Sequence, residues 1–153
     1  MRHPLAALII AIGVWVPAHA ASPGTGSVTV EHAWARATPK GAPNAVVYLT
    51  LVNNGSETDR LIGASSPVAD NIQFHEERDE NGISKMRALQ AIDVAPGAPV
   101  VLKPSGLHLM LRIKQQLKEG ETFPLTMTFE RAGPIELTVR VGKVGAMDDM
   151  SGM

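Results

Sequence analysis

Two histidines and two methionines of this chain, His75, Met86, His108 and Met110, are spaced so that they could bind one metal ion. Imidazole nitrogen binds several transition metals, whereas the thioether sulfur of methionine is a soft ligand with little affinity for zinc, calcium or magnesium. A set of two imidazoles and two thioethers therefore favours Cu(I). No thiolate can compete for the metal, because the chain contains no cysteine.

His108 and Met110 fall in a segment in which Leu107, Leu109 and Leu111 alternate with other side chains. This period of two predicts a strand over 107–113 with the leucines on its buried face. His108 and Met110 would then share the opposite, non-core face, with Cα atoms about 7 Å apart. Taken alone, the pair is better explained as an exposed histidine and a surface methionine.

His75 and Met86 flank the dipeptide 81–82, an Asn-Gly pair that is the strongest short signal for a two-residue type I′ hairpin turn. With that turn, Phe74 lies opposite Leu89, which gives the hairpin one apolar side. His75 and Met86 become diagonal neighbours on the other side, about 7 Å apart at Cα. A solvated histidine and methionine would fit this pair equally well, so the prediction of a metal site depends on both pairs together.

The composition of the chain and the two thioethers disfavour an enzyme. Without cysteine the chain cannot form disulfides, a thiolate nucleophile or the His₂Cys centre of a blue-copper protein. Two thioethers favour Cu(I) so strongly that cycling to Cu(II) would be costly. The sequence also has no recognisable Ser-His-acid set, phosphate loop or paired-carboxylate site.

The sequence around these residues predicts short strands that are separated by turns containing Gly, Pro, Asn and Asp. This pattern predicts an all-β sandwich or Greek-key barrel. Residues 113–119 are the best candidate for a short turn of helix. The predicted strands cover residues 27–35, 44–53, 58–64, 70–78, 83–93, 98–103, 107–113, 121–131 and 134–142.

Alternation also predicts which side chains form the core. Val28, Val30 and Trp34 are expected on one face of the first strand, and His32 has the same parity. We therefore expect His32 to be a packed or edge residue rather than a ligand. Met127 belongs to a second buried stripe and is assigned to the core. That stripe consists of Phe123, Leu125, Met127 and Phe129.

Residues 1–20 have the features of a secretory signal peptide. A basic start precedes an apolar run over 5–16, Pro17 breaks it, and Ala18-His19-Ala20 provides the small residues that a signal peptidase requires. The run is well short of the roughly 20 residues that span a bilayer as a helix. We expect cleavage after Ala20 and export to the periplasm, with no membrane span afterwards.

The remaining chain divides into a flexible leader at 21–26, one β domain at 27–142 and a flexible tail at 143–153. The tail contains Met147, Met150 and Met153 but no histidine. Fourteen Lys and Arg against 15 Asp and Glu leave no basic patch for phosphates, which disfavours nucleic acid as a partner.

The spacing His75-x10-Met86-x21-His108-x-Met110 resembles the signature of the PCu(A)C family of periplasmic copper chaperones. The resemblance extends over nearly all of 27–142 and all four motif positions match. It implies a cupredoxin-like Greek-key β-barrel or sandwich. Segments that resemble the family are residues 33–36, 47–51, 59–61, 85–87 and 103–108.

The resemblance implies a Cu(I) metallochaperone that delivers copper towards the CuA centre of cytochrome c oxidase, and we expect this chaperone to be a monomer. Its acceptor would be an oxidase subunit or another copper chaperone. A periplasmic copper buffer or resistance protein, which only sequesters Cu(I), would use the same four residues, so this alternative stays open. Relatives often carry a C-terminal extension rich in both Met and His, and the lack of histidine here argues against a Cu(II) role for the tail.

Overall fold

The computed structural model describes residues 27–147, which contain ten strands and no helix. The predicted signal peptide and leader, as well as residues 148–153 of the tail, lie outside the described residues. No helix that could cross a membrane occurs within 27–147. The strands are Val28–Arg36 (β1), Asn44–Asn53 (β2), Asp59–Ser65 (β3), Ala69–Glu80 (β4), Ile83–Leu89 (β5), Ile92–Val94 (β6), Val100–Leu102 (β7), Leu107–Ile113 (β8), Thr122–Phe129 (β9) and Gly133–Gly142 (β10).

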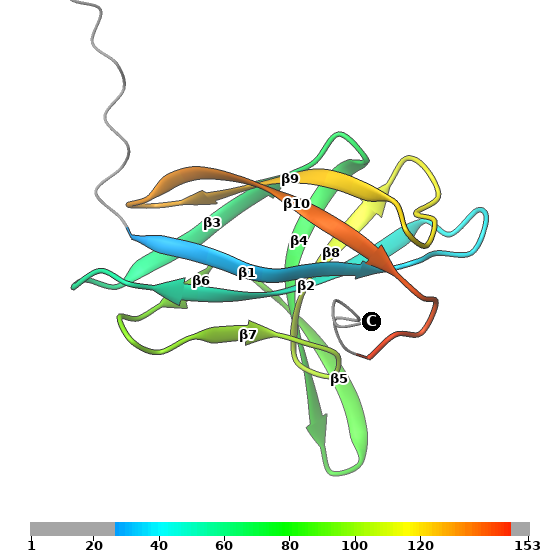
Figure 1. The fold of residues 1–153 in the computed structure, drawn as a ribbon. Coiled ribbons are helices and arrows are strands. Elements are labelled where there is room, and N and C mark those ends of the chain that lie inside the picture. The colour runs from blue at the N-terminus through cyan, green and yellow to red at the C-terminus, as the bar shows by residue number, and fades with distance from the viewer. Residues whose placement is uncertain (1–26, 148–153) are drawn as a thin grey trace, which may run out of the picture.

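All ten strands belong to one sheet of order β5-β4-β8-β2-β1-β10-β9-β3-β6. β7 lies off this path and pairs with β2 further along the strand than β8 does. The pairings between these strands are antiparallel except that of β1 with β10, which is parallel. The strands wrap around a common interior (Figure 1). Fully buried Val47, Leu109, Leu125 and Val139, from four different strands, meet in that interior. The prediction of an all-β, cupredoxin-like fold is confirmed.

A β-bulge divides β1 into two halves, and the alternation of its side chains between the two faces of the sheet reverses at the bulge. The register to β2 shifts between Glu31 and Trp34, and His32 adopts a positive φ of 52°. Because two residues of β1 here oppose one of β2, every later side chain changes sides. Trp34 therefore pairs with Tyr48 on the face away from the core, and Ala35 enters the core instead. The prediction that Trp34 shares a face with Val28 and Val30 is wrong.

Two other predictions need correction. The strand predicted at 83–93 is two strands, because β5 lies at one end of the sheet order and β6 at the other. The segment 113–119 forms no helix. Leu117 is buried instead, and its N–H and C=O bond to the Thr38 hydroxyl and N–H at 3.0 and 2.9 Å. These bonds to Thr38 replace those that a helical turn would have made.

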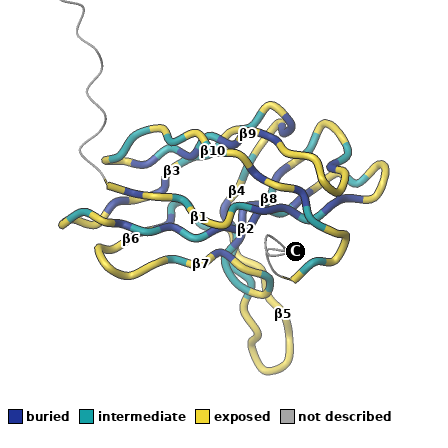
Figure 2. Tube along the Cα trace, viewed as in Figure 1, coloured by how far each residue is buried: buried dark blue, intermediate teal, exposed yellow. Residues whose placement is uncertain are grey.

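The β4–β5 hairpin has the predicted register. Asn81 and Gly82 form the two-residue turn with φ values of 57° and 79°, which a type I′ turn requires. Phe74 pairs with Leu89, as expected from that turn. The hairpin extends beyond the body of the molecule (Figure 1), and its outer part is exposed along its length (Figure 2).

Candidate metal centre

Three adjacent strands, β5, β4 and β8, bring the four candidate ligands to one face of the sheet. His75 on β4 pairs directly with His108 on β8, and their ring centroids are 5.7 Å apart. Met86 on β5 is the diagonal neighbour of His75, two residues from the direct partner of His75 on that strand. Met110 lies two residues after His108 on the same face. Residues that span 36 positions in sequence are thus neighbours, which is the arrangement that the two predicted pairs required.

His75 and Met86 place two candidate donor atoms side by side. His75 Nδ1 lies 3.3 Å from Met86 Sδ, and His75 Nε2 lies 3.2 Å from Gln73 Oε1. An amide oxygen only accepts, so Nε2–H donates to Gln73 and Nδ1 of the neutral ring keeps its lone pair. The separation of 3.3 Å is close to the roughly 3.5 Å between nitrogen and sulfur donors on a tetrahedral zinc ion.

His108 is oriented by the backbone. Its Nδ1 lies 3.1 Å from the carbonyl oxygen of Gly106, which can only accept, so Nδ1–H donates and Nε2 is left unprotonated in the neutral ring. A hydrogen bond from the non-ligating nitrogen commonly fixes the tautomer of a metal-binding histidine. Both histidines therefore have one nitrogen anchored and one available.

Burial of His108 differs from the sequence expectation of an exposed, non-core face. The side chain is only 3% exposed. Tyr48 lies edge-on to it at 6.4 Å and His75 at 5.7 Å, while Trp34 packs on Tyr48 at 4.7 Å. The bulge in β1 makes this possible, because it turns Trp34 outward and builds a second small layer on this face.

Exposure increases across the site from β8 to β5. His108 is buried, His75 and Met110 are partly buried, and Met86 is 53% exposed. Two hollows of about 370 and 310 Å³ adjoin Met110. The site therefore has a buried base and an open rim.

The surroundings of His75 favour its neutral form, which is the form a metal ligand requires. Burial, and then the nearby His108, lower the pKa of His75 below its ordinary value of 6.5. Both effects disfavour the imidazolium, so the ring stays neutral at more acidic pH than a free histidine would. Within residues 27–147, no group of three or more His, Cys, Asp or Glu side chains is placed to hold a metal ion.

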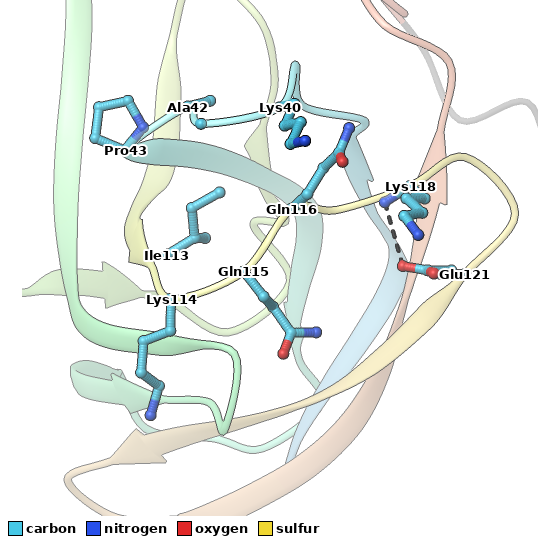
Figure 3. Close-up of a pocket in the computed structure, with 10 residues that line it drawn as sticks. Lys40, Ala42, Pro43, Ile113, Lys114, Gln115, Gln116, Lys118 and Glu121 are labelled. Carbon is cyan, nitrogen blue, oxygen red and sulfur yellow. Dashed lines mark hydrogen bonds between the residues drawn. The ribbon is translucent and has the colours of Figure 1, made fainter.

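A separate hollow of about 660 Å³ lies between the β1–β2 and β8–β9 loops (Figure 3). Lys40, Lys114 and Lys118 line it, together with Glu121, whose carboxylate accepts the Lys118 backbone N–H at 3.2 Å. It contains none of the four candidate ligands. Its cationic side chains are unsuited to a metal ion.

The sequence of residues 28–141 matches a family described as "LpqE-like: Putative lipoprotein LpqE-like". This chain belongs to the LpqE-like family. A relative of the LpqE-like domain, "Putative lipoprotein Lxx21020" of Leifsonia xyli subsp. xyli (strain CTCB07), is 32% identical over 132 residues, which are 84% of this chain and 78% of the relative.

Solved structures identify the LpqE-like domain as one of PCuAC type. The copper-bound PCuAC domain from PmoF2 is 30% identical, with a TM-score of 0.66 over 76% of this chain and 92% of that one. Apo-DR1885 from Deinococcus radiodurans is 25% identical, with a TM-score of 0.58 over 94% and 97% of the two chains. The resemblance to the PCu(A)C family is confirmed.

The sequence did not indicate three residues that contact the candidate ligands: Gln73, Gly106 and Tyr48. Gln73 has the same strand parity as His75, which could have indicated that it lies beside the ring. Tyr48 could not have been found this way, because its contact with His108 depends on the pairing of β2 with β8. Met147, the described methionine of the predicted tail, lies outside the four-residue cluster and contacts Arg36, with Sδ 3.1 Å from a guanidinium nitrogen.

Proposed function

We propose that this LpqE-like domain binds one Cu(I) ion as cargo through His75, Met86, His108 and Met110. The observation that carries the proposal is the 3.3 Å approach of His75 Nδ1 to Met86 Sδ, beside the imidazole of His108. The donor atoms would be Nδ1 of His75, Nε2 of His108 and the two thioether sulfurs. The two soft thioethers of this neutral donor set suit Cu(I) and have little affinity for zinc, calcium or magnesium.

We propose further that the domain is a metallochaperone rather than an enzyme. Its histidine base would retain the ion, while the exposed Met86 could leave first and admit a ligand of an acceptor. Such stepwise ligand exchange needs no chemical change of the metal. The acceptor would itself offer soft ligands, as a cytochrome c oxidase subunit with a CuA site or a second copper chaperone does.

Export to the periplasm is part of the same proposal. It is supported by the signal-peptide pattern of residues 1–20 and by the word lipoprotein in the family description. Intact-mass measurement of the protein isolated from its producing cell should give a chain that begins at Ala21. A membrane-bound product that retains residues 1–20 would contradict the cleavage.

Growth with scarce copper tests delivery against mere storage. Cells that carry Met86→Leu should lose cytochrome c oxidase activity when copper is scarce and recover when it is added. Cells that carry Met127→Leu are the matched control, because Met127 is fully buried in the core. A defect that appears only in excess copper would instead favour a copper buffer.

A further inference from the structure

The outer edge of β5 is open. β5 is the last strand of the sheet on its side, and within residues 27–147 it pairs only with β4. Six of its seven residues are exposed, and the hairpin extends away from the body of the molecule (Figures 1 and 2). An unpaired edge presents backbone N–H and C=O groups to which another strand can add.

The backbone groups on this open edge belong to Ser84, Met86 and Ala88. Glu77 donates its N–H to the carbonyl of Gly106 at 3.0 Å, so its backbone groups point towards β8 and away from β5. Opposite residues of an antiparallel pair alternate between bonded and non-bonded. Glu77 and Met86 thus form a non-bonded pair, and the N–H and C=O of Met86 point outward.

Charged side chains usually protect an edge strand against pairing with another strand, but on β5 these side chains are engaged in ion pairs. Lys85 bonds to Glu80 at 2.6 Å and Arg87 bonds to Glu76 at 2.8 Å, both across to β4. These ion pairs hold the two cationic side chains over the hairpin rather than over its free side. The open edge between them therefore carries no uncompensated charge against an incoming strand.

We propose that the copper acceptor docks by adding one extended strand to the free edge of β5. This inference rests on the proposed function, because it makes the candidate ligand Met86 the centre of the docking strand. A residue hydrogen-bonded opposite Met86 has its Cβ about 5 Å away on the same face. A thiol or thioether at that position would lie beside the exposed Met86 sulfur, ready to replace it on the metal.

A synthetic peptide is the probe: seven residues of alternating Thr and Val with a central Ser, added to the full apo protein at millimolar concentration. Amide exchange followed by NMR should be slow at Lys85 and Arg87 from the start, because these residues bond to β4. It should be fast at Ser84, Met86 and Ala88 and become slow when the peptide is added. Unchanged exchange at these three amides would overturn the proposal.

Two variants separate strand addition from other contacts. Ser84→Pro removes one outward N–H, which an edge strand tolerates, and should weaken peptide binding by about fivefold. Ser84→Ala removes the same hydroxyl, which bonds to Glu77 at 2.6 Å, but keeps the N–H, and should bind like the unaltered protein. Equal affinity of both variants would also overturn the proposal.

The same experiment distinguishes this proposal from the copper site itself. Docking is measured on the apo protein with a peptide that cannot bind copper, so it stands or fails without the metal. With a central Cys in the peptide, Cu(I) transfer from Ser84→Pro should be about fivefold slower, whereas transfer to a small chelator should be unchanged. Cu(I) affinity that is indifferent to Met86 would refute the proposed function and leave the docking result intact.

Discussion

At the scale of single residues, two hydrogen bonds determine which ring nitrogen of each histidine is free to bind the proposed Cu(I) ion. Gln73 engages Nε2 of His75, and the Gly106 carbonyl engages Nδ1 of His108. The two histidines therefore use opposite ring nitrogens. This asymmetry follows from their places on neighbouring strands, where one ring is flanked by a side chain and the other by a turn.

Replacing Met110 by Leu tests whether its sulfur binds the metal. The substitution nearly conserves volume, so the fold should survive. Cu(I) affinity, measured by competition with a chromophoric chelator, should fall at least tenfold, about 1.4 kcal/mol. Met127→Leu makes the same change in the core and should leave the affinity unchanged. Equal affinities of the two variants would exclude Met110 as a ligand.

The lowered pKa of His75 predicts how acid affects the apo protein and its metal. In the unfolded chain this ring takes up a proton near pH 6.5, but in the folded protein only at lower pH. His75 therefore makes the apo protein less stable as pH falls through and below 6.5, and has no such effect above it. The contribution of His75 to Cu(I) affinity should be nearly constant above pH 6.5 and fall once His75 protonates, by about tenfold per pH unit for this proton.

An NMR titration of the His75 ring and chelator competition at several pH values measure both effects. The titration midpoint of His75 should lie below 6.5. His75→Asn serves as the control, because it lacks this protonation and should lose that part of the pH dependence of stability. A His75 midpoint at or above 6.5 would contradict the stated effect of burial and of His108.

At the scale of elements, the bulge in β1 links the core to the candidate metal centre. It sends Ala35 inward and Trp34 outward, where Trp34 supports Tyr48 and Tyr48 lies against His108. Without the extra residue, the indole would be directed into a core already filled by Val47 and its neighbours. One inserted residue thus provides the packing beneath the buried histidine.

Deleting His32 should therefore destabilise the protein by about 3 kcal/mol or more, because it reverses the facing of Trp34 and Ala35. Urea unfolding followed by Trp34 fluorescence measures this. His32→Gly keeps the residue count and the positive φ, so it should change stability by less than about 1 kcal/mol. A deletion no worse than the glycine variant would show that the bulge is dispensable.

Local signals predicted the strands and the hairpin register well, because the Asn81-Gly82 turn fixes which residues lie opposite each other. The bulge at His32 was beyond such reasoning, since alternation within β1 gives no sign of a shift that only its pairing with β2 defines. The burial of His108 could not be predicted for the same reason. It depends on Tyr48 and Trp34, which come from strands that are distant in sequence.

At the scale of the whole molecule, the C-terminal segment returns to the neighbourhood of the site. Arg36 donates to the Ala146 carbonyl at 2.6 Å and to Met147 Sδ at 3.1 Å, and its guanidinium lies 5.6 Å from the centre of the Tyr48 ring. The three methionines at 147, 150 and 153 predict that the tail captures a second Cu(I) ion loosely and raises its concentration near the proposed four-residue site. Met150 and Met153, which that prediction also needs, lie outside the described residues.

Two truncations separate the parts of this prediction. A chain ending at Gly145 should fold and keep nearly full affinity at the four-residue site, since β10 ends at Gly142. It should lose a second, weaker Cu(I) equivalent and load more slowly from a dilute donor. A chain ending at Met147 keeps the Arg36 contacts but lacks the last two methionines. Full stoichiometry and loading rate in the shorter chain would leave the tail without a role in copper capture.

Parallel pairing of β1 with β10 also has a consequence for folding. These strands are about a hundred residues apart in sequence, yet they occupy the middle of the sheet order. Such distant contacts make folding slow, in the range of milliseconds to seconds, which stopped-flow fluorescence of Trp34 can measure. The two halves of the sheet order cannot join until residues 133–142 have been synthesised, so β1 has one unpaired edge in every shorter nascent chain.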